Sequence, residues 1–238
     1  MSQPLQDRRI LITGAAGGLG PTVVAAAAEA GGSLVLLDVA QDRLAPLATT
    51  HAAAVVSTHV VDLLDADAVD AFAQQLAGSG GVDVVWHLVG GWRGGKPIAQ
   101  APLEDWEWLQ GLLVRTTVHM ARSFAAQLAA SPHGRFAIIS AQQAAAPTST
   151  NAAYAASKAA AEATVLALAD DFKDTPATAN VLVVPAILTP AMRESKPDKD
   201  WGSFVPAEQI AESLVFLSST AASKMNGQRL RLYSGSPA

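Results

Sequence analysis

The chain has 238 residues, of which 50% are hydrophobic, so it is long enough to bury the core of one large α/β domain, and we predict a single domain over 1–238. A formal net charge of −5 at pH 7 excludes a basic surface for nucleic acid, and the absence of cysteine excludes disulfides, thiolate metal sites and a cysteine nucleophile. The polar start of the chain and the lack of any apolar run of ~20 residues predict a cytoplasmic protein that binds no membrane. The five histidines show no metal-ligand spacing, so no metal is predicted.

Strands and helices are predicted to alternate along the whole chain. Near-continuous β-branched runs, such as residues 82–85, suit strands buried on both faces, and a helix between successive strands implies right-handed crossovers and a parallel sheet. We therefore predict a doubly wound Rossmann fold with a seven-stranded parallel sheet. The predicted strands are 10–13, 33–38, 54–60, 82–88, 135–140, 178–185 and 228–233, and the predicted helices are 19–30, 41–49, 65–78, 103–130, 152–172 and 207–218.

The first predicted strand runs into a glycine-rich turn that opens the first helix. Gly14 permits a sharp exit from the strand, and Gly18 lets a pyrophosphate approach the backbone because no Cβ stands in the way. Gly20 lets the helix and the strand pack closely. Together with Leu19, these residues predict a dinucleotide phosphate site at a helix N-terminus.

Carboxylates follow the second and third predicted strands. Asp38 stands eighteen residues after Gly20, where it would accept the ribose hydroxyls and repel the 2′-phosphate of NADP, and no arginine follows directly. NAD is therefore favoured over NADP, with the alternative that Asp38 only caps the next helix. Asp62 and Leu63 are candidates for the edge and the face of the adenine, with the alternative that Asp62 is a helix cap, although Asp65 or Asp67 suits that role better.

The fourth predicted strand ends in a second glycine-rich stretch. Val89, Gly90 and Gly91 lie where glycine lets a cofactor come close to the backbone. Trp92 follows on this loop and is a candidate to cover a flat substrate. The alternative is that Trp92 only caps the core.

The helix at 152–172 carries Tyr154 and Lys158 one turn apart on one face. A lysine ammonium beside a phenol stabilises the phenolate and is expected to lower the pKa of the tyrosine, which suits proton transfer near neutral pH. The same lysine can hold the nicotinamide-ribose hydroxyls. We therefore predict that Tyr154 and Lys158 are catalytic.

Three motifs in this order resemble the short-chain dehydrogenase/reductase family. Residues 13–20 match its TGxxxGxG loop, residues 154–158 its YxxxK motif, and residues 185–189 the segment after its sixth strand. The resemblance covers nearly the whole chain and implies an NAD(P)-dependent oxidoreductase that acts on a small molecule. It also implies Tyr154 as general acid/base, Lys158 as its modulator and ribose ligand, and Pro185, Ile187 and Thr189 beside the nicotinamide.

The chain departs from the family pattern at two positions. The family serine, thirteen residues before the tyrosine, falls on Ala141, and Ser140 stands one position short, pointing to the opposite side if the strand continues. The family asparagine on the fourth helix falls on Leu113. A ketone reductase would therefore lack the hydroxyl that polarises the carbonyl.

These departures are similar to one branch, the quinonoid dihydropteridine reductases. Residues 90–95 (GGWRGG), 188–193 (LTPAMR) and 196–200 (KPDKD) resemble segments of that branch, which also lacks the serine. The resemblance implies an NADH-dependent reductase of a small flat conjugated acceptor, a quinonoid dihydropterin or another imine-like compound. Such an acceptor takes up hydride without forming a full alkoxide, so that Tyr154 suffices as a proton donor.

The stretch 191–204 is charged, interrupted by proline and ends in aromatic residues. We interpret it as a substrate lid that carries Met192 and Trp201, with a plain surface loop as the alternative. Gln142 or Gln143 is a second candidate for the missing hydrogen-bond donor.

Two other functions stay open on the sequence. One is a ketone or alcohol oxidoreductase in which Ser140 takes the place of the missing serine. The other is a cofactor-binding regulator without turnover, which Ala141 and Leu113 suggest and the retained tyrosine and lysine oppose. The small residues of 152–169, with the helix at 103–130, further predict a homodimer or homotetramer.

Overall fold

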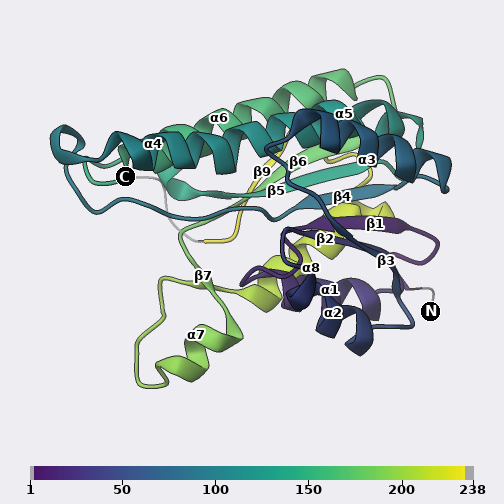
Figure 1. The fold of residues 1–238 in the computed structure, drawn as a ribbon, viewed down its shortest axis with the longest axis horizontal. Coiled ribbons are helices and arrows are strands. Elements are labelled where there is room, and N and C mark those ends of the chain that lie inside the picture. Colours follow the sequence, from purple (N-terminus) through teal and green to yellow (C-terminus); the bar gives the residue numbers. More distant parts are fainter. Residues whose placement is uncertain (1–2, 234–238) are drawn as a thin grey trace.

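The computed structural model describes residues 3–233, and a parallel sheet of seven strands forms its middle layer (Figure 1). The sheet order is β3-β2-β1-β4-β5-β6-β9, and each neighbouring pair is parallel. The predicted Rossmann fold is confirmed. The strands are β1 (Arg9–Thr13), β2 (Ser33–Asp38), β3 (Val55–Val60), β4 (Val84–His87), β5 (Arg135–Ala141), β6 (Thr178–Val184) and β9 (Arg229–Arg231).

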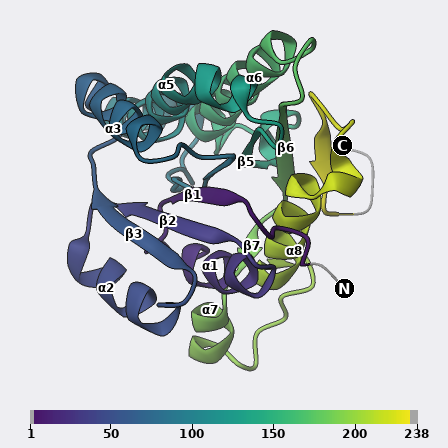
Figure 2. The same cartoon turned by 90° about the vertical axis from the view of Figure 1, so that its right-hand side faces the viewer.

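Helices cover both faces of this sheet (Figures 1 and 2). The helices α1 (Gly20–Glu29), α2 (Gln41–Thr50) and α8 (Ala207–Ser218) lie on one side. The helices α3 (Ala66–Gly78), α5 (Thr116–Ala130) and α6 (Ala152–Asp171) lie on the other. Asp65 caps α3, as predicted, because its side chain accepts a hydrogen bond from the Ala68 backbone N–H.

The predicted helix at 103–130 is interrupted. It consists of α4 (Leu103–Leu109), a π-helical segment (Gln110–Arg115) and α5. The hydroxyls of Thr116 and Thr117 at the start of α5 donate to the carbonyls of Leu112 and Leu113 in the π-helical segment.

A short second sheet was not predicted. Its strands β7 (Ile187–Leu188) and β8 (Val205–Pro206) bring together the two ends of the segment that holds α7 (Pro190–Ser195). In Figure 1 this segment projects away from the layers. Strand pairing therefore ties the two ends of the segment together at its base.

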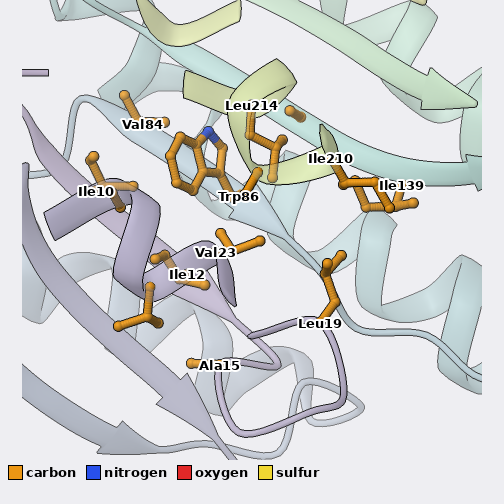
Figure 3. Packing of buried hydrophobic residues seen from close by; sticks show 14 of the residues in the cluster. Ile10, Ile12, Ala15, Leu19, Val23, Val84, Trp86, Ile139, Ile210 and Leu214 are labelled. Carbon is orange, nitrogen blue, oxygen red and sulfur yellow. The ribbon is translucent and has the colours of Figure 1, made fainter. Parts of the chain in front are cut away.

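Two apolar clusters fill the space on either side of the sheet. In one of them Trp86 is fully buried with Val23 and Leu214 among its neighbours, as Figure 3 shows, and its indole N–H donates to the Ser218 hydroxyl over 2.9 Å. The other cluster packs α3, α5 and α6 against the strands and includes Phe72 and Phe124. None of the helices in residues 3–233 combines the length and apolarity that a bilayer-crossing segment requires.

Candidate active site

A cavity of about 1020 Å³ lies at the carboxyl ends of the central strands. The chain reverses its direction of winding between β1 and β4, and this is where an open parallel sheet leaves a crevice for a ligand. Most of the predicted site residues meet here. They are Gly14, Gly18, Leu19, Asp38, Asp62, Leu63, Val89, Gly90, Gly91, Trp92, Ser140, Tyr154, Lys158, Pro185, Ile187, Thr189 and Met192.

The first glycine-rich turn leaves the space that a phosphate group needs. Gly14 has a φ of +70°, a conformation that favours glycine, and a Cβ at Gly18 would lie 3.5 Å from the Thr189 side chain. Gly20 does not line the cavity, and a Cβ there would overlap the carbonyl of Ala15. Gly20 therefore serves the close packing of helix and strand, and the open cradle at Gly18 fits a pyrophosphate beside the N-terminus of α1.

Asp38 is held by the backbone rather than used as a helix cap. Its Oδ2 accepts from the Ala16 N–H over 3.0 Å and its Oδ1 from the Val39 N–H over 2.8 Å. The cap position of α2 is Ala40, so the capping alternative is wrong. Arg43 also lines the cavity, with its guanidinium 3.6 Å from Asp38 Oδ1, and the sequence reasoning missed it because it considered only the positions directly after the strand.

The third strand leads to the far end of the cavity. Asp62 Oδ1 accepts a hydrogen bond from the Leu64 N–H over 2.9 Å, and Leu63 is buried. The ring nitrogen Nδ1 of His119 donates to the Leu63 carbonyl over 2.8 Å. These contacts fix the backbone between β3 and α3 and leave an apolar residue and a carboxylate side by side on the cavity wall.

Tyr154 and Lys158 project from α6 into the cavity, and the expected direction of the tyrosine pKa is wrong. Burial raises the pKa of Tyr154 to about 12, so the phenol keeps its proton at neutral pH. Burial lowers the pKa of Lys158 to about 8, against the opposing charge of Glu162. The Lys158 ammonium lies 6.0 Å from the Tyr154 ring centroid and donates to the Ile139 carbonyl over 2.7 Å.

Ser140 lines the cavity but its hydroxyl is used inside the protein. The Oγ atom donates to Glu162 Oε1 over 2.6 Å, and the residue is 1% exposed. It cannot donate the same proton to a substrate carbonyl, so the predicted substitution of Ser140 for the family serine is wrong. Ala141, at the position of that serine, is buried and lines the cavity. Leu113, at the position of the family asparagine, is buried in the π-helical segment.

The residues predicted to contact a substrate separate into two groups. Trp92 lines the cavity and is 60% exposed, so it does not cap the core. Gln142 does not line the cavity, whereas Gln143 does. Trp201 does not line it either, and instead packs edge-on against Phe204, which does, at a centroid distance of 4.9 Å.

Sequence reasoning also missed cavity residues on α4, on the π-helical segment and on α5. Trp108, Leu112 and Thr116 line the cavity, and the π-helical segment lies between the first and the last of them. The three residues follow one another at intervals of four, a spacing that places them on one helical face, so an α-helical period was the signal that could have found them. The guanidinium of Arg93 lies 4.1 Å over the Trp108 ring, which fixes one wall.

A buried histidine lies beneath the cavity. His87 Nδ1 is 2.7 Å from the Thr13 hydroxyl and Nε2 is 3.1 Å from the Thr116 hydroxyl. Because the Thr116 hydroxyl donates to the Leu112 carbonyl, it accepts from Nε2, and Nδ1 accepts from Thr13. Burial, followed by the charge of Lys158, lowers the pKa of His87 to about 3, so the ring is neutral.

Residues 8–200 match the family pattern described as short chain dehydrogenase. The chain is 34% identical over 194 residues to the 1-deoxy-11-beta-hydroxypentalenate dehydrogenase of Streptomyces avermitilis, covering 79% of this chain and 72% of that one. Its fold is similar to hydroxysteroid dehydrogenase from Escherichia coli, with 25% identity, 99% of each chain covered and a TM-score of 0.84. It is also similar in fold to a short chain dehydrogenase from Escherichia coli CFT073 solved in complex with NADPH, with 22% identity, 97% and 98% coverage and a TM-score of 0.87. The chain belongs to the short-chain dehydrogenase/reductase family of NAD(P)-dependent oxidoreductases.

Proposed function

We propose that this protein is an NADH-preferring reductase of small, flat, conjugated acceptors with a C=N bond, of the quinonoid dihydropterin type, and that Tyr154 donates the proton. The observation that carries the proposal is the pairing of Ala141 with Ser140. Ala141 lines the cavity at the position of the family serine. The hydroxyl of the neighbouring Ser140 donates its hydrogen bond to Glu162. A site without that hydroxyl suits an acceptor that develops little oxyanion character.

The cofactor supplies the hydride when it is bound. The cradle around Gly18 would hold its pyrophosphate, Asp38 its adenosine ribose, and Lys158 its nicotinamide ribose. The remaining cofactor residues in the proposal are Gly14, Leu19, Asp62, Leu63, Val89, Gly90, Gly91, Pro185, Ile187 and Thr189.

The preference for NADH rests on Asp38, which lines the cavity at the end of β2. Its carboxylate would accept ribose hydroxyls and repel a 2′-phosphate. Arg43 acts in the opposite sense, because a guanidinium attracts phosphate. Arg43 is 57% exposed, and Asp38 is 7% exposed and held by two backbone N–H groups, so the carboxylate is the more firmly placed of the two charges.

The raised pKa of Tyr154 suits a proton donor. At neutral pH the phenol is protonated, so it can give its proton to the acceptor nitrogen as hydride is transferred. The phenolate left behind is stabilised by the Lys158 ammonium. Thr116 also lines the cavity, but its hydroxyl proton is donated to the Leu112 carbonyl.

Aromatic and apolar side chains form the walls that would contact a flat ring. Trp92, Trp108 and Phe204 line the cavity from three separate segments. Planar rings gain contact area and favourable stacking against such side chains. Met192 and Leu112 add adaptable apolar surface.

The first experiment is NADH oxidation by the purified protein with chemically generated quinonoid dihydropterin, with simple ketones as competing acceptors and NADPH as the cofactor control. We expect turnover of the dihydropterin with a preference for NADH. Efficient reduction of simple ketones by the unaltered protein would overturn the proposed acceptor class.

Replacement of Tyr154 by Phe separates catalysis from binding. We expect Tyr154→Phe to abolish turnover and to retain NADH binding, because the ring stays and only the proton donor is lost. Fluorescence titration with NADH is the control for binding. A variant that keeps its turnover would show that another group donates the proton.

A second candidate, alcohol oxidation or ketone reduction, is favoured by one observation, the name of the Streptomyces avermitilis dehydrogenase, which denotes a hydroxylated substrate. In this case Gln143, whose side chain is half-buried at the cavity, would donate to the carbonyl oxygen. Ala141→Ser distinguishes the two candidates. We expect it to keep dihydropterin turnover and to create ketone reduction, whereas an enzyme that already reduces ketones through Gln143 would lose that activity in Gln143→Ala.

We also propose that two or four copies assemble through α5 and α6. Val118 on α5 is 40% exposed, and a second copy would cover it. Sedimentation velocity at micromolar concentration tests the assembly, and a monomer at all concentrations would contradict it.

A further inference from the structure

Three ionisable side chains follow one another along α6 at intervals of four residues. Tyr154, Lys158 and Glu162 therefore share one face of the helix. The side chains of Lys158 and Glu162 both contact β5, through the Ile139 carbonyl and the Ser140 hydroxyl respectively. The proposed catalytic pair thus continues into a third charged residue, which the sequence analysis did not single out.

Glu162 is a buried carboxylate with both oxygens in use. It is 4% exposed, Oε1 accepts from the Ser140 hydroxyl over 2.6 Å, and Oε2 accepts from Arg229 Nε over 2.5 Å. Arg229 lies on the edge strand β9 and is half exposed. A charged carboxylate is stable in the protein interior only when hydrogen-bond partners replace its water of hydration. The Ser140 and Arg229 contacts do this, and they hold Glu162 one helical turn from Lys158.

We propose that Glu162 is a positioning residue that keeps the buried Lys158 side chain charged for the phenolate of Tyr154, and that Arg229 limits this effect from the outer edge of the sheet. The proposal rests on the proposed roles of Tyr154 and Lys158. Glu162 acts on the reaction indirectly. It does not line the cavity that would hold the cofactor and the acceptor, and its effect is exerted through Lys158.

The groups around Lys158 explain why a nearby negative charge matters. From β4 it faces His87, which is neutral, and from β5 it meets the Ile139 carbonyl, which accepts its hydrogen bond. On its own helix the phenol of Tyr154 lies one turn before it and the carboxylate of Glu162 one turn after it, on the same face. Burial lowers the pKa of Lys158 to about 8, and Glu162 opposes that fall. Removal of the carboxylate would leave burial unopposed, lower the pKa of Lys158 further and raise the neutral fraction of its side chain at physiological pH.

The test is the titration of Lys158 in the full-length protein without substrate. Lysine labelled with ¹³C at Cε reports its own protonation by NMR, and the spectrum of Lys158→Arg assigns the signal. In Glu162→Gln, which keeps the shape of the side chain and removes its charge, we expect the titration of Lys158 to move to lower pH by about one pH unit. Arg229→Gln removes the positive charge that partly neutralises Glu162, so we expect the titration of Lys158 to move to higher pH. The expected shift is about half of that in Glu162→Gln, because Arg229 is half exposed and solvent screens its charge.

The two variants are expected to shift the titration of Lys158 in opposite directions. A merely structural role of Glu162 and Arg229 would shift it in the same direction in both variants, or in neither. An unchanged Lys158 titration in folded Glu162→Gln would overturn the proposal. If Glu162→Gln does not fold, as judged by circular dichroism, Arg229→Gln decides alone, and no shift or a downward shift there rejects the proposal.

The pH profile of turnover is the second readout. With any acceptor that the enzyme reduces, we expect the fall in kcat at high pH to begin at lower pH in Glu162→Gln, and Glu162→Asp to restore part of the difference. A profile that coincides with that of the unaltered enzyme contradicts the proposal. Because the NMR titration needs no acceptor, the role of Glu162 can be tested even if the proposed acceptor class is wrong.

Discussion

The pH dependence of stability tests the buried His87. This residue is 2% exposed and its pKa is lowered to about 3, first by burial and then by the charge of Lys158. The neutral ring bridges the hydroxyls of Thr13 and Thr116. In the unfolded chain the same imidazole is hydrated and titrates near its ordinary value of about 6.5. Below about pH 6.5, folding therefore requires the His87 side chain to give up its proton.

The direction and size of the effect follow from these two values. Because the folded-state pKa lies below the unfolded-state value, the unfolded chain binds more protons between about pH 6.5 and pH 3. Stability is present in full above this window and is lost as the pH falls through it. At pH 5, about 1.5 units below the unfolded-state value, the loss for His87 is about 2 kcal/mol. This is a large share of a typical unfolding free energy of about 5–15 kcal/mol.

Urea denaturation at pH 7 and at pH 5 measures the loss. The variants are His87→Asn and, as a matched control, His51→Asn, which changes a half-buried histidine at the end of α2. We expect His87→Asn to be less stable at pH 7, because it loses buried hydrogen bonds, and to lose about 2 kcal/mol less than the unaltered protein between the two pH values. The carboxylates are common to all three proteins, so their contribution cancels. An equal loss in all three would refute the reasoning.

Two further predictions concern the cofactor site. Gly20→Ala places a Cβ against the Ala15 carbonyl, so we expect it to lower the unfolding free energy by about 2 kcal/mol or more, whereas Gly18→Ala, with its Cβ 3.5 Å from the Thr189 side chain, should keep the fold and weaken NADH binding. Thermal denaturation and fluorescence titration measure the two effects, and equal melting temperatures for both variants would contradict the first. Asp38→Ser removes the repulsion of a 2′-phosphate, so we expect kcat/KM for NADPH relative to NADH to rise about tenfold or more, equivalent to about 1.4 kcal/mol. An unchanged ratio would show that Asp38 does not select the cofactor.

Most of the architecture was predictable because its signals are local. Buried parallel strands require apolar β-branched runs, and the runs at 33–38, 135–140 and 178–185 agree closely with β2, β5 and β6. The interruption of the helix at 103–130 was not predictable, since a π-helical segment of six residues carries no sequence period that distinguishes it from an α-helix. The pairing of β7 with β8 was missed for a related reason, because strands of two residues carry too little pattern to recognise.

The candidate site was predictable where a motif sets the position of a residue along one element. The four-residue interval of Tyr154 and Lys158 places both on one face of α6, and the turn after β1 brings Gly18 to the cavity. The substrate side was predicted less well. Phe204 rather than Trp201 reaches the cavity, and this depends on how the segment 189–204 between β7 and β8 packs against itself.

By itself the sequence determined the family, the order of strands and helices, the glycine cradle and the tyrosine–lysine pair, because each depends on spacing within a short stretch and on the conformations that glycine permits. Only the tertiary structure decided how those groups are charged and bonded. Ser140 is bound to Glu162, which lies 22 residues away, and the threonine partners of His87 lie 74 and 29 residues away. The pKa of Tyr154 is raised rather than lowered because the whole fold buries the phenol. Hydrogen-bond partners and desolvation depend on distances between elements, and these distances exist only after the helices have packed onto the sheet.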